Sequence, residues 1–211
     1  DNEMSSNTAA KTPANTTTKT RMMVQIAMLT AVAEVLMLFD FPLPFAPSFY
    51  KIDLSEVPIL IGCFAMGPAA GIIIEAMKIL LNFIISGTVT AGVGELANFA
   101  IGCSMVLPAG LIYRYHKTRK NAVLGMAAGT LVMAAIGGLL NAFVLLPAYA
   151  ALFGGMDAII GMGTAVNKNI TSVQSFVLLS VVPFNLVKGV IVSLVTFLLY
   201  KHVSRILIHN A

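Results

Sequence analysis

Five long apolar runs constrain this chain more than any other feature of its sequence. They cover about residues 22–39, 56–86, 95–113, 122–147 and 176–200, and each is long enough to cross ~30 Å of hydrocarbon as a helix. Because 58% of the residues are hydrophobic and only 10% are charged, the chain cannot fold as a soluble domain around a single core. The sequence therefore predicts an all-α, polytopic membrane protein.

Short basic clusters decide how many times the chain crosses the membrane. They are Lys19 and Arg21 before the first run, Arg114, Lys117, Arg119 and Lys120 between the third and fourth, and Lys201 and Arg205 after the last. The positive-inside rule places all three clusters in the cytoplasm, so the number of crossings between successive clusters must be even. Five crossings cannot satisfy this, but six can if the run 56–86 is broken at Gly67-Pro68. Pro68 lacks an N–H and restricts Gly67, which favours a helix end there. We predict six transmembrane helices with both termini cytoplasmic.

The first 20 residues differ from the rest of the chain. They are rich in Asn, Thr, Ser and Ala, and they lack the apolar core and the cleavage site of a signal peptide. We expect residues 1–20 to form a disordered cytoplasmic tail and residues 21–205 to form the six-helix transmembrane domain. The loops outside the membrane are then 40–54, 87–94 and 148–175.

The first outside loop is unusually rich in aromatic residues and proline. Its aromatic residues include Phe41, Phe45, Phe49 and Tyr50, and three prolines lie among them. Such a loop could be a stiff apolar lid over a planar ligand, because aromatic faces stack and prolines reduce the entropy lost on ordering. The alternative is an aromatic belt that anchors helix ends at the membrane interface. Composition alone favours neither.

Lys188 is a charged residue near the middle of the last apolar run. A lysine at the bilayer centre costs at least ~2.5–3.5 kcal/mol on insertion scales, so it is expected to face a polar cavity or a partner. Asn185 lies three residues earlier, on the same face of a helix. Asn141 lies about 20 residues from the cytoplasmic start of its helix, in the outer leaflet. The three side chains could line one cavity that is open to the exterior and binds a polar ligand.

Three further charged residues lie in or beside the apolar runs. Glu75 and Lys78 are spaced three residues apart on one helix, close enough to form an ion pair, and Asn82 continues that face. Glu95 opens the next helix, where the helix dipole favours a carboxylate in the first turn. A structural ion pair and a contact with ligand both remain open for these residues.

Motifs for catalysis and nucleotide binding are absent from the sequence. There is no GxxxxGK(S/T) loop, HExxH or GxSxG, and His116, His202 and His209 all fall in flanks expected to be cytoplasmic. Cys63 and Cys103 lie inside apolar runs without metal-ligand spacing. The net charge of +4 comes from clusters beside the spans, which orientation explains without nucleic acid. We predict no enzyme, no metal and no direct use of ATP by this chain.

Several segments together resemble the substrate-binding S components of energy-coupling factor (ECF) transporters, specifically the riboflavin-specific branch. In chain order they are KIDLSEVP from Lys51, GPAAG from Gly67, GELANF from Gly94, NAFVLLPAY from Asn141 and PFNLVKG from Pro183. The resemblance covers about residues 20–205, and it includes Glu75 and Lys78 after the second segment. The order of the segments makes it more specific than any one of them.

The resemblance implies a six-helix bundle in a prokaryotic cell membrane that binds riboflavin from outside as its transported ligand, without a cofactor. It also implies docking on a membrane T subunit that carries two ATPase subunits. By the same resemblance, Asn141, Asn185 and Lys188 match the family's riboflavin contacts, and the aromatic first loop is interpreted as the lid.

The remaining candidate residues are also carried by the resemblance. Glu75, Lys78 and Glu95 are candidates for ligand contacts or for partners of the contact residues. Ala27 and Ala31 form an AxxxA pair that resembles the family's docking surface for the T subunit, since small residues four apart allow close helix approach.

Two alternative functions remain open. The first keeps the fold but changes the ligand to another vitamin or a flavin-related compound, which a titration with a panel of vitamins would separate. The second is an ion-coupled secondary carrier or a structural membrane subunit. No inverted repeat is visible in the sequence, although secondary carriers usually have one.

Overall fold

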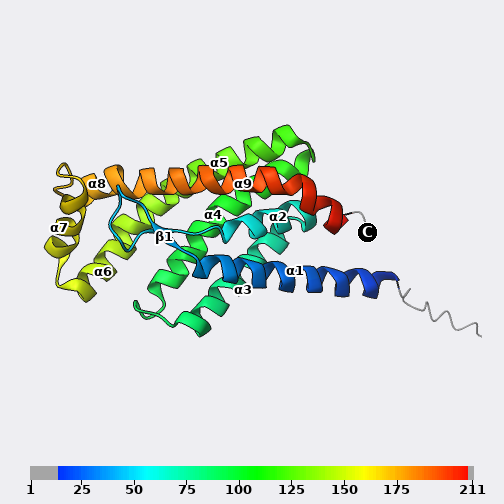
Figure 1. Cartoon of the computed structure of the whole chain (residues 1–211), viewed down its shortest axis with the longest axis horizontal. Helices are drawn as coiled ribbons and strands as arrows, with labels where there is room; N and C mark the ends of the chain where they lie inside the picture. Colours follow the sequence, from blue (N-terminus) through cyan, green and yellow to red (C-terminus); the bar gives the residue numbers. More distant parts are fainter. Residues whose placement is uncertain (1–13, 209–211) are drawn as a thin grey trace, which may run out of the picture.

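The computed structural model describes residues 14–208, and these residues form a bundle of helices (Figure 1). In chain order the elements are α1 (Ala14–Leu38), β1 (Phe41–Pro42), β2 (Lys51–Ile52), α2 (Glu56–Met66), α3 (Pro68–Ser86), α4 (Val93–Tyr115), α5 (Arg119–Leu140), η1 (Asn141–Leu145), α6 (Leu146–Phe153), α7 (Met156–Val166), α8 (Val173–Phe176), η2 (Val177–Val181) and α9 (Val182–Ile208). The two short strands pair antiparallel, with Phe41 opposite Ile52. The all-α prediction is confirmed.

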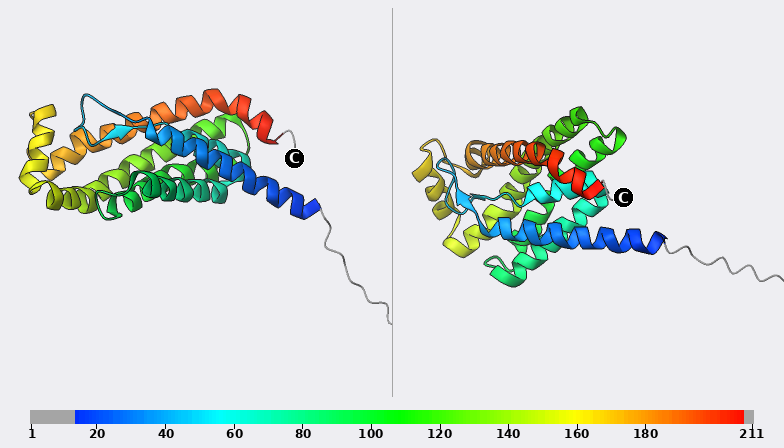
Figure 2. Two further views of the ribbon diagram at one scale, coloured as in Figure 1. Left: turned by 60° about the horizontal axis from the view of Figure 1, so that its bottom comes forward. Right: turned by 45° about the vertical axis from the view of Figure 1, so that its right-hand side comes forward.

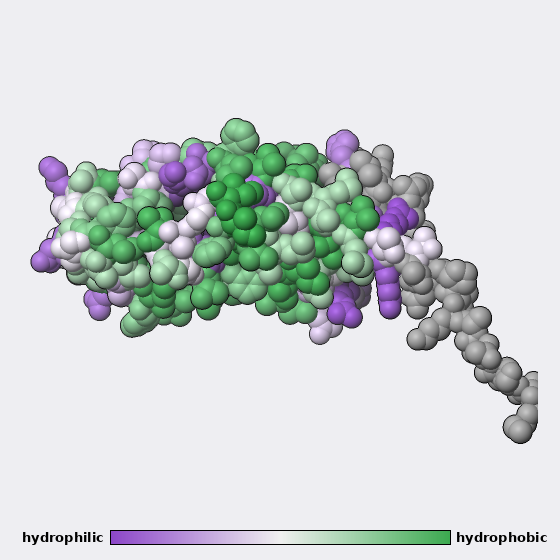
Figure 3. Space-filling view, turned by 90° about the horizontal axis from the view of Figure 1, so that it is seen from below, coloured by the Kyte–Doolittle hydropathy of each residue, from purple (hydrophilic) through white to green (hydrophobic). Residues whose placement is uncertain are grey.

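Five stretches of helix are long and apolar enough to cross a membrane. They are Thr17–Leu38, Pro68–Ser86, Val93–Tyr115, Arg119–Phe153 and Val173–Tyr200, and the helices α2 and α7 are apolar but shorter. Their outward side chains are largely hydrophobic, as expected for contact with lipid: Figure 3 shows one face of the molecule that is hydrophobic over most of its middle. The prediction of an all-α membrane protein therefore holds.

The predicted break in the apolar run 56–86 is confirmed at Gly67. The helix α2 ends at Met66, Gly67 has a φ of +103°, and Pro68 is the first residue of α3. The positive φ is a conformation that glycine adopts without steric cost, and proline suits the first turn of a helix because that N–H has no helical partner. Local chemistry thus divides one apolar run into two helices.

The short helix α2 lies inside the bundle rather than against lipid. Every residue from Glu56 to Phe64 is buried, and α2 packs against α1, α3, α4 and α9. At 1.5 Å per residue it is about 16 Å long, too short to cross a bilayer unaided. Its neighbours enclose it.

Small residues set the closest helix packing in the bundle. Gly125 and Gly129 of α5 lie against the backbone of α4, and a Cβ at Gly125 would stand 2.7 Å from the carbonyl oxygen of Ala109. Spacing of four residues puts both glycines on one helix face, so α4 and α5 approach backbone to backbone. This contact fixes α5 against α4, whose first turns line part of the cavity.

The secondary structure differs from the expected one in three places. The helix α1 already begins at Ala14, within the segment 1–20 that we expected to be a disordered tail, while residues 1–13 lie outside the described residues. The outside segment 148–175 contains α7 and most of α6, separated by Gly154 and Gly155, both with positive φ. Within the last helical stretch and at Asn141, single π-helical turns interrupt the α-helices. Such turns often lie at functional sites.

Candidate functional site

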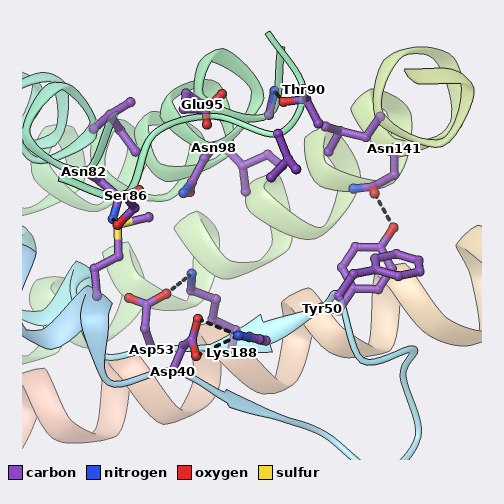
Figure 4. Close-up of a pocket in the computed structure, with 18 of the residues that line it drawn as sticks. Asp40, Tyr50, Asp53, Asn82, Ser86, Thr90, Glu95, Asn98, Asn141 and Lys188 are labelled. Carbon is purple, nitrogen blue, oxygen red and sulfur yellow. Dashed lines mark hydrogen bonds and ion pairs between the residues drawn. The ribbon is translucent and has the colours of Figure 1, made fainter. Parts of the chain in front are cut away.

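A cavity of about 680 Å³ lies between the first loop and the ends of α3, α4, η1 and α9. Its size is typical of sites for drug-sized ligands. Figure 4 shows Asn82, Glu95 and Asn98 on one side of it and Asp53, Lys188 and Tyr50 on the other. Asn141 and Asn185 also line it. The cavity therefore combines amide groups, charged groups and aromatic rings on facing walls.

Lys188 forms an ion pair with Asp53 that no local sequence pattern predicts. Its Nζ lies 3.3 Å from Oδ2 of Asp53, a residue at the end of the first loop, and both side chains are about one-tenth exposed. Asp53 also accepts a hydrogen bond of 2.8 Å from the N–H of Ser55. Burial by itself would raise the pKa of Asp53, but Lys188, Lys78 and the Ser55 donors outweigh it and lower the pKa below its usual value. The carboxylate therefore stays ionised beside Lys188.

Asn141 and Asn185 meet at a single glycine of α5. The amide of Asn141 donates to the carbonyl oxygen of Gly137 at 2.7 Å, and the amide of Asn185 donates to that of Val181 at 3.0 Å. A Cβ at Gly137 would stand 2.6 Å from Nδ2 of Asn185. Only a glycine leaves space for the Asn185 amide here. The predicted grouping of Asn141, Asn185 and Lys188 along one cavity is what the structure has.

The first loop closes one side of the cavity with Phe49 and Tyr50. The ring of Phe49 lies 5.4 Å from that of Tyr149, and the ring of Tyr50 lies 5.4 Å from that of Phe184. The Tyr50 hydroxyl donates to Oδ1 of Asn141 (Figure 4). Burial, with a smaller contribution from Tyr149, raises the pKa of Tyr50, so the hydroxyl keeps its proton.

The other two residues predicted for the lid lie away from the cavity. Phe41 is exposed in β1, and Phe45 packs against the hydrophobic cluster beneath the loop. An exposed ion pair of 3.1 Å between Lys51 and Asp40 links the two sides of the loop near its strands. Exposed pairs of this kind contribute little stability. The docked aromatic rings are the main contacts that hold the loop.

Glu75 and Lys78 form the ion pair that their spacing predicted, but they do not line the cavity. Nζ of Lys78 lies 2.8 Å from Glu75 and 3.0 Å from Glu56, and all three side chains are at most 1% exposed. Lys78 also donates to the hydroxyl of Ser55 at 3.3 Å. The carboxylate of Glu75 fits against Gly102 of α4, where a Cβ would stand 2.6 Å from its carboxyl carbon. The cluster lies behind the site, and Ser55, which accepts from Lys78, follows Asp53 by two residues in the sequence.

Glu95, a candidate for a ligand contact or for a partner of the contact residues, lines the cavity at the start of α4. It accepts a hydrogen bond of 3.0 Å from the Thr88 hydroxyl. Asn82 and Asn98 line the same wall, although the helical spacing of Asn82 indicated only that it shares a face with Glu75 and Lys78. Asn82 donates to Glu34 of α1 at 3.2 Å.

The outside segment 148–175 contributes one residue to the cavity lining, Tyr149 of α6. Asn167, Lys168 and Asn169 do not line the cavity.

Fold and site together define a helical membrane protein with a cavity of a size that suits a small molecule, lined by amide, charged and aromatic side chains. The family model described as "ECF transporter, substrate-specific component" matches residues 21–200. The chain is 35% identical over 187 residues to the riboflavin transporter RibU of Staphylococcus aureus, covering 89% of this chain and 92% of that protein. It is 33% identical over 183 residues to the riboflavin transporter FmnP of Bacillus subtilis, covering 86% and 91%.

A solved structure agrees with these relatives. The chain matches one reported as "Structure and mechanism of the S component of a bacterial ECF transporter" with a TM-score of 0.71, 35% identity, and coverage of 90% of this chain and 99% of that one. The chain therefore belongs to the substrate-specific components of ECF transporters. It is a multi-pass cell-membrane protein of a transport family rather than an enzyme.

Proposed function

We propose that this chain binds riboflavin from outside the cell as the S component of an ECF importer and delivers it through a T subunit driven by two ATPase subunits. The observation that carries the proposal is the cavity of about 680 Å³ on which Asn141, Asn185 and Lys188 converge with the aromatic residues of the first loop. The similarity to the riboflavin transporters of S. aureus and B. subtilis supports this ligand.

The chemistry of the cavity suits riboflavin. The dione edge of the isoalloxazine ring and the ribityl hydroxyls both donate and accept hydrogen bonds, which amides and an ammonium group can complement. The rings of Phe49, Tyr149 and Phe184 offer apolar and aromatic surface to the tricyclic ring. In this proposal Asn141, Asn185, Lys188 and Glu95 contact the vitamin. Glu75 and Lys78 act behind them by fixing the start of α2.

The topology that we propose has six crossings with both termini in the cytoplasm. The N-terminal end of α1, the α4–α5 connection and the C-terminal end of α9 lie toward one end of the bundle, and the first loop and α7 lie toward the other (Figures 1 and 2). The basic clusters belong to the first end, which favours a cytoplasmic position. The short helix α2 then makes one of the crossings, and the ligand cavity opens toward the exterior.

Titration of the purified, ligand-free protein with riboflavin tests the ligand. The expected result is saturable quenching of flavin fluorescence with one riboflavin per chain. Other vitamins and flavin precursors, titrated in parallel, should bind far more weakly. Saturable binding of a different vitamin in place of riboflavin would leave the fold assignment intact and contradict riboflavin as the ligand. Uptake that follows a proton or sodium gradient without an ATPase partner would contradict the proposal of an ATPase-driven importer.

Gly137→Ala is expected to weaken riboflavin binding about tenfold while leaving the yield of folded protein close to that of the wild type. The added methyl would displace the amide of Asn185 from its place in the cavity, and losing one buried hydrogen bond costs ~1–3 kcal/mol. Gly138→Ala is the matched control, because a Cβ there would make ordinary contacts of 3.4 Å with Val177 and Val182. Equal riboflavin affinities of the two variants would show that Asn185 does not contact the ligand.

Ala27→Leu and Ala31→Leu test the proposed docking surface on α1. Both alanines are exposed, and their spacing of four residues puts them on one face of the helix. Larger side chains there should block close helix approach, so riboflavin binding by the isolated chain stays unchanged while uptake by the assembled transporter is lost. Val123→Leu on the exposed face of α5 serves as the control. Normal uptake by the α1 variants would place the T subunit on another surface.

A further inference from the structure

A second cavity, of about 490 Å³, lies at the other end of the bundle from the ligand site. It is lined by the last residues of α2, the break at Gly67, the first residues of α3 and the end of α4. The two cavities share no lining residue. Glu95, in the first turn of α4, lines the ligand site, whereas Arg114, in its last turn, lines the second cavity. At 1.5 Å per residue these positions are about 28 Å apart.

The second cavity is both cationic and apolar. Arg114 and Lys117 line it with exposed side chains, and within residues 14–208 neither forms an ion pair and no acidic residue lines the cavity. The remaining lining is largely apolar and includes Phe64, Met66 and Pro68. Two uncompensated cations beside an apolar wall favour an anion that carries hydrocarbon.

The backbone at the break adds to the polar side of this cavity. Ala69 lines it, and because Ala69 lies in the first turn of α3, its N–H has no partner within the helix. The side chains of Leu111 on α4 and Ile73 on α3 are exposed near the same helix ends. Hydrocarbon that leaves the cavity therefore meets further apolar surface of the protein.

We propose that this second cavity binds the phosphate headgroup of an anionic phospholipid, with Arg114 and Lys117 as the phosphate contacts. A planar guanidinium can bind two phosphate oxygens at once, and an ammonium adds a second charge. Basic pockets between transmembrane helices on the cytoplasmic side are the kind of site that recognises anionic lipid headgroups. The side of the membrane rests on the topology proposed above; the chemistry of the cavity does not depend on riboflavin.

Native mass spectrometry of the full chain, stripped of lipid and titrated with dioleoyl phosphatidylglycerol, tests the site. The wild type should retain one phosphatidylglycerol in preference to phosphatidylcholine. The variant Arg114→Gln/Lys117→Gln should bind phosphatidylglycerol roughly thirtyfold more weakly, given the contribution of each basic residue near an anionic lipid. Arg119→Gln/Lys120→Gln removes two exposed charges from the adjacent start of α5, outside the cavity lining, and should change binding less than threefold.

A second variant separates the cavity from surface charge. Ala69→Trp fills the space without removing a cation, and it should weaken lipid binding to a similar extent. An unchanged affinity in Ala69→Trp, or equal losses in the two charge variants, would show attraction to the general basic surface and overturn the proposal. Displacement of the lipid by inorganic phosphate at equal concentration would make this a site for free phosphate. Riboflavin titration of each variant reports folding and the proposed ligand site separately.

Discussion

Replacing Lys78 with methionine is expected to lower the yield of folded protein more than any other single substitution discussed above. The ammonium group is fully buried between Glu56 and Glu75, at 3.0 and 2.8 Å. Without it, two buried carboxylates lose their counter-charge. Removing one partner from a buried ion pair costs about 3–5 kcal/mol, a large fraction of a total stability of ~5–15 kcal/mol. Thermal unfolding in detergent and recovery as a single chromatographic peak would measure the effect.

Two further variants make this result specific to the ion pairs. Lys120→Met removes an exposed lysine that has no ion pair among residues 14–208, and it should unfold near the wild-type temperature. The triple variant Lys78→Met/Glu56→Gln/Glu75→Gln removes every charge of the cluster and should recover part of the lost stability, because no buried charge is left uncompensated. If Lys78→Met proved as stable as Lys120→Met, the cluster would not contribute to stability.

Replacing Lys188 with methionine is expected to reduce riboflavin affinity ten- to a hundredfold. A hydrogen bond to a charged group contributes about 1.5–3 kcal/mol, and Lys188 is a charged donor lining the cavity. The substitution also leaves Asp53 without its ion-pair partner at 3.3 Å, so the protein should become less stable as well. Flavin fluorescence titration measures the first effect, and the unfolding temperature measures the second.

A double variant separates these two effects. Lys188→Met/Asp53→Asn contains neither charge, so it should regain stability relative to Lys188→Met and still bind riboflavin weakly. In the same loop, Asp40→Asn breaks an exposed ion pair with Lys51, and its stability should change by less than about 1 kcal/mol. Recovery of riboflavin affinity in the double variant would mean that Lys188 serves only to neutralise Asp53.

Local sequence patterns predicted those parts of the fold and site that depend on neighbouring residues. A proline after a glycine predicted the end of α2, and spacings of three residues predicted the Glu75–Lys78 pair and the shared face of Asn185 and Lys188. Each is a property of one helix, where three or four positions along the chain fix a common direction. Such features need no knowledge of the tertiary structure.

Partners that are distant in the sequence could not be predicted in this way. Asp53 precedes Lys188 by 135 positions, and Glu56 stands 22 positions before Lys78 on a different helix. In the sequence, Asp53 stands out only as part of a segment that resembles the family, and no pattern links it to Lys188. A charged residue inside an apolar run indicates that a counter-charge exists, but several carboxylates could supply it. The choice among them depends on how the helices pack.

The enclosure of α2 also has a consequence for how this protein fits its bilayer. A short hydrophobic helix exposed to lipid would thin the bilayer around it or tilt its neighbours, at a cost that depends on membrane thickness. Because α2 is surrounded by α1, α3, α4 and α9, lipid tails meet the longer helices instead. The hydrophobic thickness of the protein is therefore independent of the length of α2. Changes in the length of α2 would act on the ligand site rather than on the match with the membrane.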